Sequence, residues 1–200
     1  MQRIVETLRA ASSETGTGLY VGCGNGRNYL PLVDAGLDLV GLDVSPEAIR
    51  RVVERRPSLV AGRLICDDFL GWAPSRPAFD YVIALQVFQH GHDADVAAYL
   101  AKVAALVRPG GLFFLRVNSA TTQIYHAHTM VERNSLGGFT IRYDDGPKCG
   151  MLIHFFSDLE LRERLMPLFH PALEPQEDVT VRAAPKTGSW AQWETIWTRR

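Results

Sequence analysis

The stretch LYVGCGNGRN at positions 19–28 decides the fold, because it sets three closely spaced glycines between an apolar run and a helical pattern. The letters LYV predict a short buried strand, and residues 25–35 predict a helix that Gly36 terminates. Glycines crowded between a strand and a helix typically let a backbone approach a ligand closely. The stretch therefore predicts a ligand-binding turn at the carboxyl end of a first strand.

Strands alternate with helices along the rest of the first 118 residues. Strands are expected at 38–44, 63–68, 79–88 and 112–118, and helices at 3–10, 46–56 and 93–107. Ser45 followed by Pro46 is typical of a helix start. Five strands separated by helices predict right-handed crossovers and a parallel sheet covered on both faces.

The pattern changes after residue 118. GFTIRY (138–143) and MLIHFF (151–156) flank DDGPKCG, which predicts a hairpin or an inserted pair of strands. A helix is expected at 158–169, followed by closing antiparallel strands at 178–184 and 191–198. The expected fold is α/β, with a doubly wound, mostly parallel seven-stranded sheet and a β-hairpin-type insert after the fifth strand.

Composition excludes several classes of partner. The chain is 46% hydrophobic and 22% charged, and its formal net charge is −1, so it has no broad basic field for nucleic acid or an anionic membrane. Its three cysteines are isolated and show no spacing typical of a disulfide framework or a zinc site. The sequence has no apolar signal core and no stretch as long as a membrane span. We expect a reduced, cytoplasmic protein.

The glycine spacing separates two classes of cofactor. Dinucleotide sites need G-x-G-x-x-G, and although Gly22 and Gly24 fit, the third position is Arg27, which argues against NAD or FAD. VGCGNGRN instead resembles the G-x-G-x-G motif of the class I S-adenosylmethionine-dependent methyltransferases. The resemblance covers residues 18–118 and implies a Rossmann-like methyltransferase fold. It also implies S-adenosylmethionine as cofactor, S-adenosylhomocysteine as product, and a single domain over 1–200, with a cofactor-binding half at 1–118 and an acceptor-binding insert and closing strands at 119–200.

The resemblance also assigns cofactor-binding residues. Asp43, with Val44 beside it, is implied to accept hydrogen bonds from ribose hydroxyls, and Asp67 to face the adenine amino group. Asp68 and Phe69 are implied to lie beside the adenine ring. The glycine turn and the end of the fourth strand are implied to border the methionine portion and the methyl group, through Gly22, Cys23, Gly24, Asn25, Gly26, Asn28, Leu85, Gln86 and Val87.

One position departs from the family pattern. Relatives carry Asp or Glu two residues before the first glycine, where it helps to anchor the amino-acid end of the cofactor, and this chain has Tyr20. Compensation by the Tyr20 hydroxyl or by backbone carbonyls near Ala84 and Leu85 is open at this point. So is a scaffold that has lost catalysis.

Fewer sequence features indicate how the methyl acceptor is bound. The Pro-Pro segment typical of nucleobase amine methylation is missing, so DNA and RNA are not expected acceptors. Functional side chains gather in the insert, and we expect His126, Arg142, Tyr143 and Lys148 to contact the acceptor, with the cations binding an anionic group. Arg142 and Lys148 could equally pair with Asp144 and Asp145 on a solvated hairpin.

His90 stands nearest in sequence to the expected methyl-transfer site. It is the candidate general base, and a purely structural role is the alternative. His126 and His128 lack a convincing third ligand, so no metal site is expected.

Three functions remain open from the sequence. The leading one is a biosynthetic methyltransferase acting on an O or N atom of a small or medium metabolite, including an anionic intermediate or a peptide, as a monomer or homodimer. The second is a non-catalytic S-adenosylmethionine-binding or partner-binding module, which Tyr20 favours. The third is a nicotinamide oxidoreductase, which Arg27 disfavours.

Overall fold

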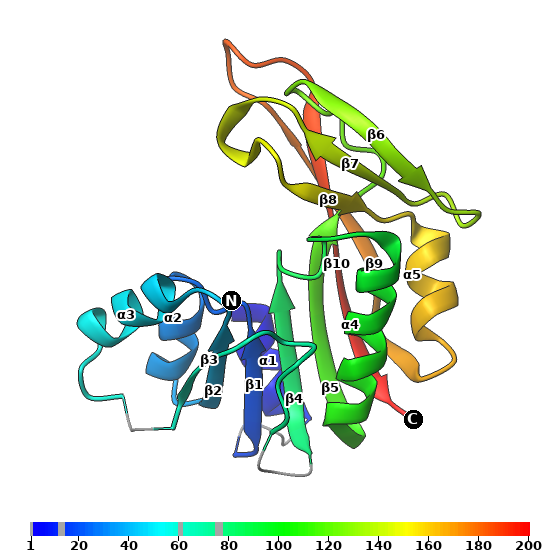
Figure 1. Cartoon of the computed structure of the whole chain (residues 1–200). Helices are drawn as coiled ribbons and strands as arrows, with labels where there is room; N and C mark the ends of the chain where they lie inside the picture. Colours follow the sequence, from blue (N-terminus) through cyan, green and yellow to red (C-terminus); the bar gives the residue numbers. More distant parts are fainter. Residues whose placement is uncertain (1, 12–14, 60–61, 75–77) are drawn as a thin grey trace.

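The strand that leads into the glycine turn, β1 (Thr17–Val21), is an interior strand of a seven-stranded sheet (Figure 1). The computed structural model describes residues 2–11, 15–59, 62–74 and 78–200. Leu19 and Val21 pack into one core cluster, whereas Tyr20 between them packs into a second. Because successive side chains of a strand point to opposite faces, β1 has a buried core on each side.

The order of strands in the sheet is β3-β2-β1-β4-β5-β10-β9. β1 pairs in parallel with β2 (Asp38–Asp43) and β4 (Phe79–Leu85), and outside them lie β3 (Leu64–Cys66) and β5 (Val107–Asn118). Two antiparallel strands complete the sheet, β10 (Ser189–Arg199) and β9 (Phe169–Val181). Strand order reverses between β1 and β4, and ligands of open α/β sheets bind at that switch point.

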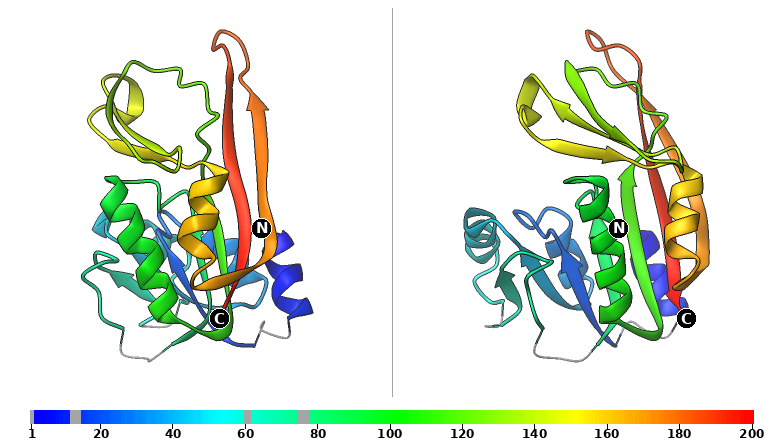
Figure 2. Two further views of the ribbon diagram at one scale, coloured as in Figure 1. Left: turned by 90° about the vertical axis from the view of Figure 1, so that its right-hand side faces the viewer. Right: turned by 45° about the vertical axis from the view of Figure 1, so that its right-hand side comes forward.

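Helices cover both faces of the sheet. α4 (Asp93–Leu106) and α5 (Asp158–Leu165) contribute to the same core cluster as Leu19. α1 (Gln2–Ala10), α2 (Tyr29–Asp34) and α3 (Pro46–Arg55) contribute to the cluster that holds Tyr20. The left view of Figure 2 shows α4 and α1 on opposite sides of the sheet. Among the described residues, no helix has the length and apolarity that crossing a membrane requires.

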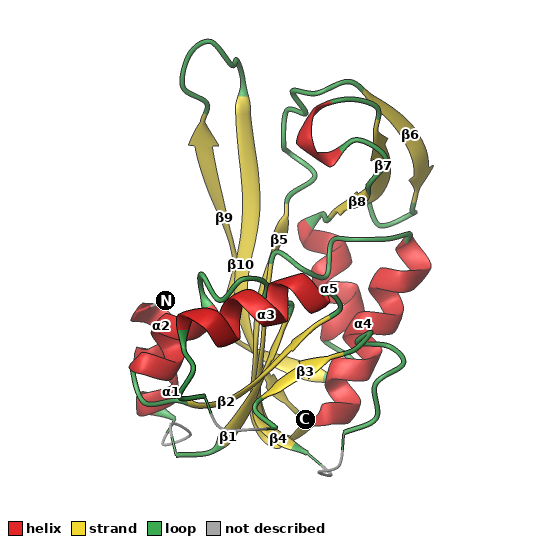
Figure 3. Ribbon diagram, turned by 60° about the vertical axis from the view of Figure 1, so that its left-hand side comes forward, coloured by secondary structure: helices red, strands yellow, loops and turns green. Residues whose placement is uncertain are grey.

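The insert after β5 forms a separate antiparallel sheet in the order β6-β7-β8. Its elements are β6 (His128–Arg133), β7 (Phe139–Tyr143), the 3-10 turn η1 (Gly146–Lys148) and β8 (Leu152–Phe155). A small apolar core, made by Phe139, Ile141, Ile153 and Phe155, stabilises it. Figure 3 shows this insert standing beside the far ends of β9 and β10.

The expected fold class is confirmed, and three local expectations are corrected. The helix expected at 25–35 begins only at Tyr29, because Gly26 has a φ of +83°, which no α-helix accepts. β9 begins at residue 169 instead of 178. Its first half was missed because Pro171 and Pro175 argue against a strand. β9 is an edge strand, however, and edge strands tolerate prolines. The expected hairpin β7–β8 is extended by a third strand, β6. Almost all residues of β6 are exposed, so its sequence has no alternation of apolar and polar residues that would predict a strand.

Candidate functional site

A cavity of about 400 Å³ opens at the carboxyl ends of β1 and β2, at the switch point of the sheet. Seven of the residues expected to bind a cofactor line it: Gly22, Asp43, Val44, Asp67, Asp68, Phe69 and Val87. The candidate base His90 lines it too. Residues from four separate stretches of sequence therefore meet around one hollow.

The glycine turn is held tightly against β2. The backbone N–H groups of Gly22 and Cys23 both donate to the carbonyl of Leu42, at 2.8 and 3.1 Å. Gly22 has a φ of +69°, and a Cβ there would lie 2.6 Å from a methyl group of Val87. A side chain at Gly24, by contrast, would meet no atom within 4 Å. The turn is thus packed on one side and open on the other.

Asp43 joins the glycine turn to the start of α3. One carboxylate oxygen accepts the N–H of Gly24 at 2.7 Å, and the other accepts the N–H of Ser45 at 2.9 Å. Each oxygen keeps a further lone pair, so the carboxylate can still accept hydrogen bonds from a ligand that lines the cavity. Ser45 in turn caps α3 by accepting the N–H of Ala48 at 3.2 Å.

The wall opposite the glycine turn follows β3. The N–H of Asp67 donates to the carbonyl of Asp43 at 3.1 Å, and the Asp68 carboxylate accepts the N–H of Gly71 at 2.8 Å. Phe69 is buried, with its ring centroid 5.2 Å from that of Phe88. This wall combines two carboxylates with an apolar floor.

His90 lies between the cavity and the insert. Burial, followed by the positive charge of Lys148, lowers the pKa of His90 below the usual histidine value, while the backbone of Gln86 opposes this shift. A neutral imidazole that lines the cavity has the properties of a general base.

Several residues expected at the cofactor do not line the cavity. Tyr20 is buried in the opposite core, where burial raises the pKa of its hydroxyl and the Asn28 side chain is hydrogen-bonded to it. Cys23 is also buried, and burial raises the pKa of its thiol to about 12. Asn25, Gly26 and Leu85 lie outside the lining residues as well.

Gln86 is a special case among them. It has a φ of +63°, which is unusual for a residue with a side chain. Its side-chain oxygen accepts from Gln89, while its buried Nε2 has no hydrogen-bond partner among the described residues.

The residues expected to bind the acceptor differ in whether their side chains are already paired within the insert. Arg142 pairs with Asp144 at 3.3 Å and His126 with Asp145 at 3.0 Å, so both are engaged within the insert. Tyr143 is packed against the ring of His126. Lys148 remains solvent-accessible, and its charge acts on His90.

Sequence reasoning missed five lining residues: Val21, Leu42, Phe88, Tyr99 and Met151. The first two end β1 and β2, so the strand pattern could have indicated them. Tyr99 comes from α4 and Met151 from the start of the insert's last strand, and only the tertiary fold brings them here. The ring of Tyr99 stacks on that of Phe88 with centroids 5.1 Å apart.

Part of the chain is similar to known proteins. Residues 19–111 match the family model described as a methyltransferase domain. A ubiquinone biosynthesis O-methyltransferase of Methylobacterium sp. (strain 4-46) is 30% identical over 115 residues, which cover 52% of this chain and 42% of the relative. The chain thus spans under half the length of this curated relative.

Two solved structures have the same fold. The 1,6-didemethyltoxoflavin-N1-methyltransferase of Burkholderia thailandensis, with 1,6-didemethyltoxoflavin and S-adenosylhomocysteine bound, is 20% identical. The match has a TM-score of 0.65 and covers 100% of this chain and 78% of the Burkholderia chain. A methyltransferase of Methanosarcina mazei is 18% identical, with a TM-score of 0.69 and 96% coverage of both chains. Residues 19–111 thus match a methyltransferase domain, and the chain has the Rossmann-like fold that these two solved methyltransferases share.

Proposed function

We propose that the protein transfers a methyl group from S-adenosylmethionine to an O or N atom of a small or medium metabolite, including an anionic biosynthetic intermediate or a peptide. The observation that carries the proposal is the cavity at the switch point, where the glycine turn, Asp43 and Asp67 meet His90. The names of its relatives agree with it, since one is an O-methyltransferase and another an N-methyltransferase bound to S-adenosylhomocysteine.

The residues around the cavity fit the proposed cofactor. The open side of Gly24 leaves room for a ligand against the backbone, and Asp43 retains acceptor capacity for hydroxyl groups. We assign the cofactor to Gly22, Gly24, Asp43, Asp67, Asp68 and Phe69. When bound, S-adenosylmethionine supplies an electrophilic methyl group.

The protein's own contribution begins with positioning. Holding two reactants in line is worth roughly 7–11 kcal/mol of the barrier in favourable cases. His90, which lines the cavity and has a lowered pKa, then accepts the proton of an acceptor hydroxyl or amine. A carboxylate acceptor would not need this step, because it carries no proton that must leave.

Lys148 is the insert cation best placed to recognise an anionic group. Within the described part of the chain it has no carboxylate partner, and partial burial lowers the pKa of its ammonium group. Arg142 is already paired with Asp144. The anionic group of an acceptor would therefore bind at Lys148, beside His90.

Calorimetric titration with S-adenosylmethionine and S-adenosylhomocysteine, with NADH as the control ligand, tests the cofactor assignment. Asp43→Ala should weaken both sulfur ligands by roughly 10- to 150-fold, because a hydrogen bond to a charged group contributes roughly 1.5–3 kcal/mol. Asp34→Ala, which removes a surface carboxylate paired with Arg56, is the matched control and should bind normally. If the unaltered protein binds neither sulfur ligand, the partner-binding module becomes the better function.

Acceptor recognition is tested separately, after a screen of phenolic, amine and carboxylate acceptors. Lys148→Ala should raise KM for an anionic acceptor while leaving cofactor affinity unchanged, and Arg142→Ala should change KM much less. Equal effects of the two substitutions would contradict the assignment of Lys148.

A further inference from the structure

The wall of the cavity that follows β3 is formed by an exposed turn. We define the Phe69 turn as residues 68–72. Of these residues Phe69 alone is buried, with 5% of its surface exposed, and it lines the cavity. A turn with few buried contacts opens easily, so a group that fastens this turn also fixes the shape of the cavity wall.

Part of the Phe69 turn is held by its own hydrogen bonds. The Asp68 carboxylate accepts the N–H of Gly71, and the Asp68 carbonyl accepts the N–H of Trp72, both at 2.8 Å. The ring of Trp72 packs against that of Phe79, with centroids 6.3 Å apart. Among the described residues, no backbone N–H group donates to the carbonyl of Leu70 or Trp72. These two acceptors are left for a side chain.

Lys102 of α4 supplies that side chain. Its Nζ donates to the carbonyl of Leu70 at 2.8 Å and to that of Trp72 at 2.5 Å. The same nitrogen lies 5.4 Å from the centroid of the Phe69 ring, which is within the range of a cation–π interaction. An ammonium group has three donors, so it can make these contacts together. One charged group therefore contacts the buried ring of the turn and two of its carbonyls.

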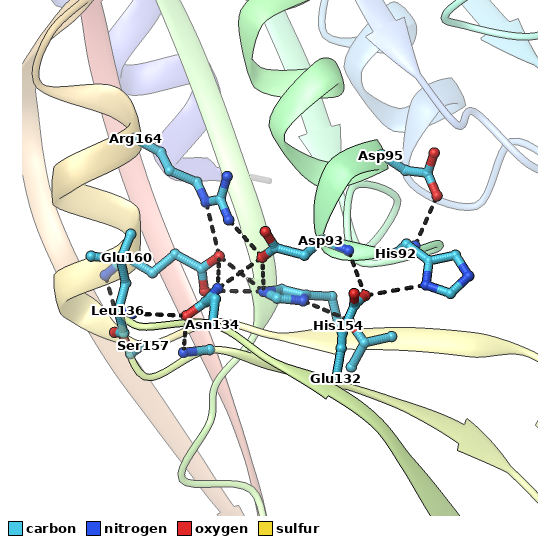
Figure 4. A network of polar contacts seen from close by, with 12 residues as sticks. His92, Asp93, Asp95, Glu132, Asn134, Leu136, His154, Ser157, Glu160 and Arg164 are labelled. Atoms are coloured by element: carbon cyan, nitrogen blue, oxygen red, sulfur yellow. Dashed lines mark hydrogen bonds and ion pairs between the residues drawn. The ribbon is translucent and has the colours of Figure 1, made fainter.

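The helix that carries Lys102 is itself firmly attached. At the start of α4, the N–H of Asp93 donates to the Glu132 carboxylate at 2.7 Å, and the Asn134 amide donates to the Asp93 carboxylate at 2.8 Å (Figure 4). The apolar side of α4 is buried in the core around Leu100. Lys102 therefore acts from a fixed support, and the turn is the part that it restrains.

Direct binding of a ligand by Lys102 is a weaker explanation of these contacts. Lys102 does not belong to the lining residues of the cavity, whereas Phe69 does. Tyr99, which lies one helical turn before Lys102, also lines the cavity, and its ring centroid is 6.2 Å from that of Phe69. The route from the ammonium group to a ligand therefore passes through the Phe69 ring.

We infer that Lys102 is a positioning residue, which holds the Phe69 turn against α4 and so fixes the Phe69 ring at the wall of the cavity. The inference rests on the proposed function, because it takes the cavity as the site of S-adenosylmethionine. A ring that is fixed before the ligand arrives lowers the ordering cost of binding. Removal of the ammonium group should therefore weaken cofactor binding, although the group lies outside the lining.

Calorimetric titration with S-adenosylhomocysteine tests the inference without a methyl acceptor. Lys102→Met keeps an unbranched side chain and removes the ammonium group, so the affinity should fall roughly 3- to 30-fold. Arg162→Met is the matched control, because it removes a cation from α5 that pairs with Asp158 at 2.9 Å and does not line the cavity. It should leave the affinity unchanged. If Lys102→Met does not fold, Lys102→Gln also removes the charge and should weaken binding over the same range.

A double-mutant cycle separates positioning from a general loss of stability. Phe69→Leu removes the ring through which Lys102 is inferred to act. Adding Lys102→Met to Phe69→Leu should then lower the affinity by no more than about twofold further. A general loosening would lower it by the same factor in both backgrounds. Hydrogen exchange at the amides of Gly71 and Trp72 should also be faster in Lys102→Met and unchanged in Arg162→Met.

Three results would overturn the inference. They are a loss of affinity below threefold in Lys102→Met, the same loss in the Phe69→Leu background as in the unaltered protein, or unchanged exchange at Gly71 and Trp72. Failure of the unaltered protein to bind S-adenosylhomocysteine would count against the proposed function instead. The exchange rates would still report whether Lys102 holds the turn.

Discussion

A pair of glycine substitutions tests how tightly the glycine turn is packed. Gly22 and Gly24 both have positive φ values, +69° and +54°. Alanine at either position pays the cost of left-handed backbone, roughly 1–2 kcal/mol. At Gly22 the added Cβ would also lie 2.6 and 2.8 Å from two carbons of Val87, whereas at Gly24 it would meet nothing within 4 Å.

The two variants should therefore differ in stability. Overlap in a packed region adds roughly 1–3 kcal/mol, so Gly22→Ala should lower the free energy of unfolding by about 2–5 kcal/mol. Gly24→Ala should lower it by only about 1–2 kcal/mol. Urea unfolding followed by circular dichroism measures both values, provided that the slopes of the transitions agree.

Val87→Ala supplies the control, because it removes the methyl carbon 2.6 Å from the new Cβ, while the Cβ of residue 87 at 2.8 Å remains. In a double-mutant cycle, Gly22→Ala and Val87→Ala should therefore couple favourably, by part of the roughly 1–3 kcal/mol of steric cost. The same cycle built on Gly24→Ala should show no coupling. Equal losses for the two glycine variants, or additive effects of Gly22→Ala and Val87→Ala, would refute the steric reasoning.

Three further predictions concern the cap of α3 and the two groups beside the cavity. Ser45→Ala removes the hydroxyl that accepts the N–H of Ala48, and urea unfolding should show a loss of about 0.5–2 kcal/mol. Burial lowers the pKa of His90 in the folded state, so the unfolded chain binds more protons as the pH falls through the usual histidine range. The free energy of unfolding should therefore fall as the pH is lowered from about 7.5 to about 5.5. His90→Gln should lose less of it than the unaltered protein over the same range. Lys148→Ala should raise the pKa of His90 by removing a nearby positive charge, and NMR titration should find no such change in Arg142→Ala.

Local chemistry made half of the site predictable from the sequence. Gly22 and Gly24 carry their own signal, because few other residues accept positive φ in a tight turn. Asp43 is marked by its place between a buried strand and the Ser45-Pro46 helix start. Each of these signals lies within a few residues of the group that it positions, so no knowledge of the tertiary fold is required.

The rest depends on contacts between distant segments. Tyr99 and Met151 reach the cavity only because α4 and the insert pack across the strand ends. Arg142 and His126 had the expected chemistry, yet Asp144 and Asp145 satisfy them locally. Nothing in MLIHFF indicated that His154 would contact a buried carboxylate, since its partner Glu160 belongs to a helix that follows the strand.

The backbone bonds between the insert and residues 89–91 bear on how an acceptor could enter. Swinging β8 away would break the bond from His154 to Gln89 and the bond from Gly91 to Leu152, and would expose the fully buried contact between His154 and Glu160. Such a movement is a local unfolding event and not the motion of a hinged lid. The amide hydrogens of Gly91 and His154 should therefore exchange with deuterated solvent as slowly as those of the central sheet. An acceptor would then have to reach the cavity while β8 stays bound to residues 89–91.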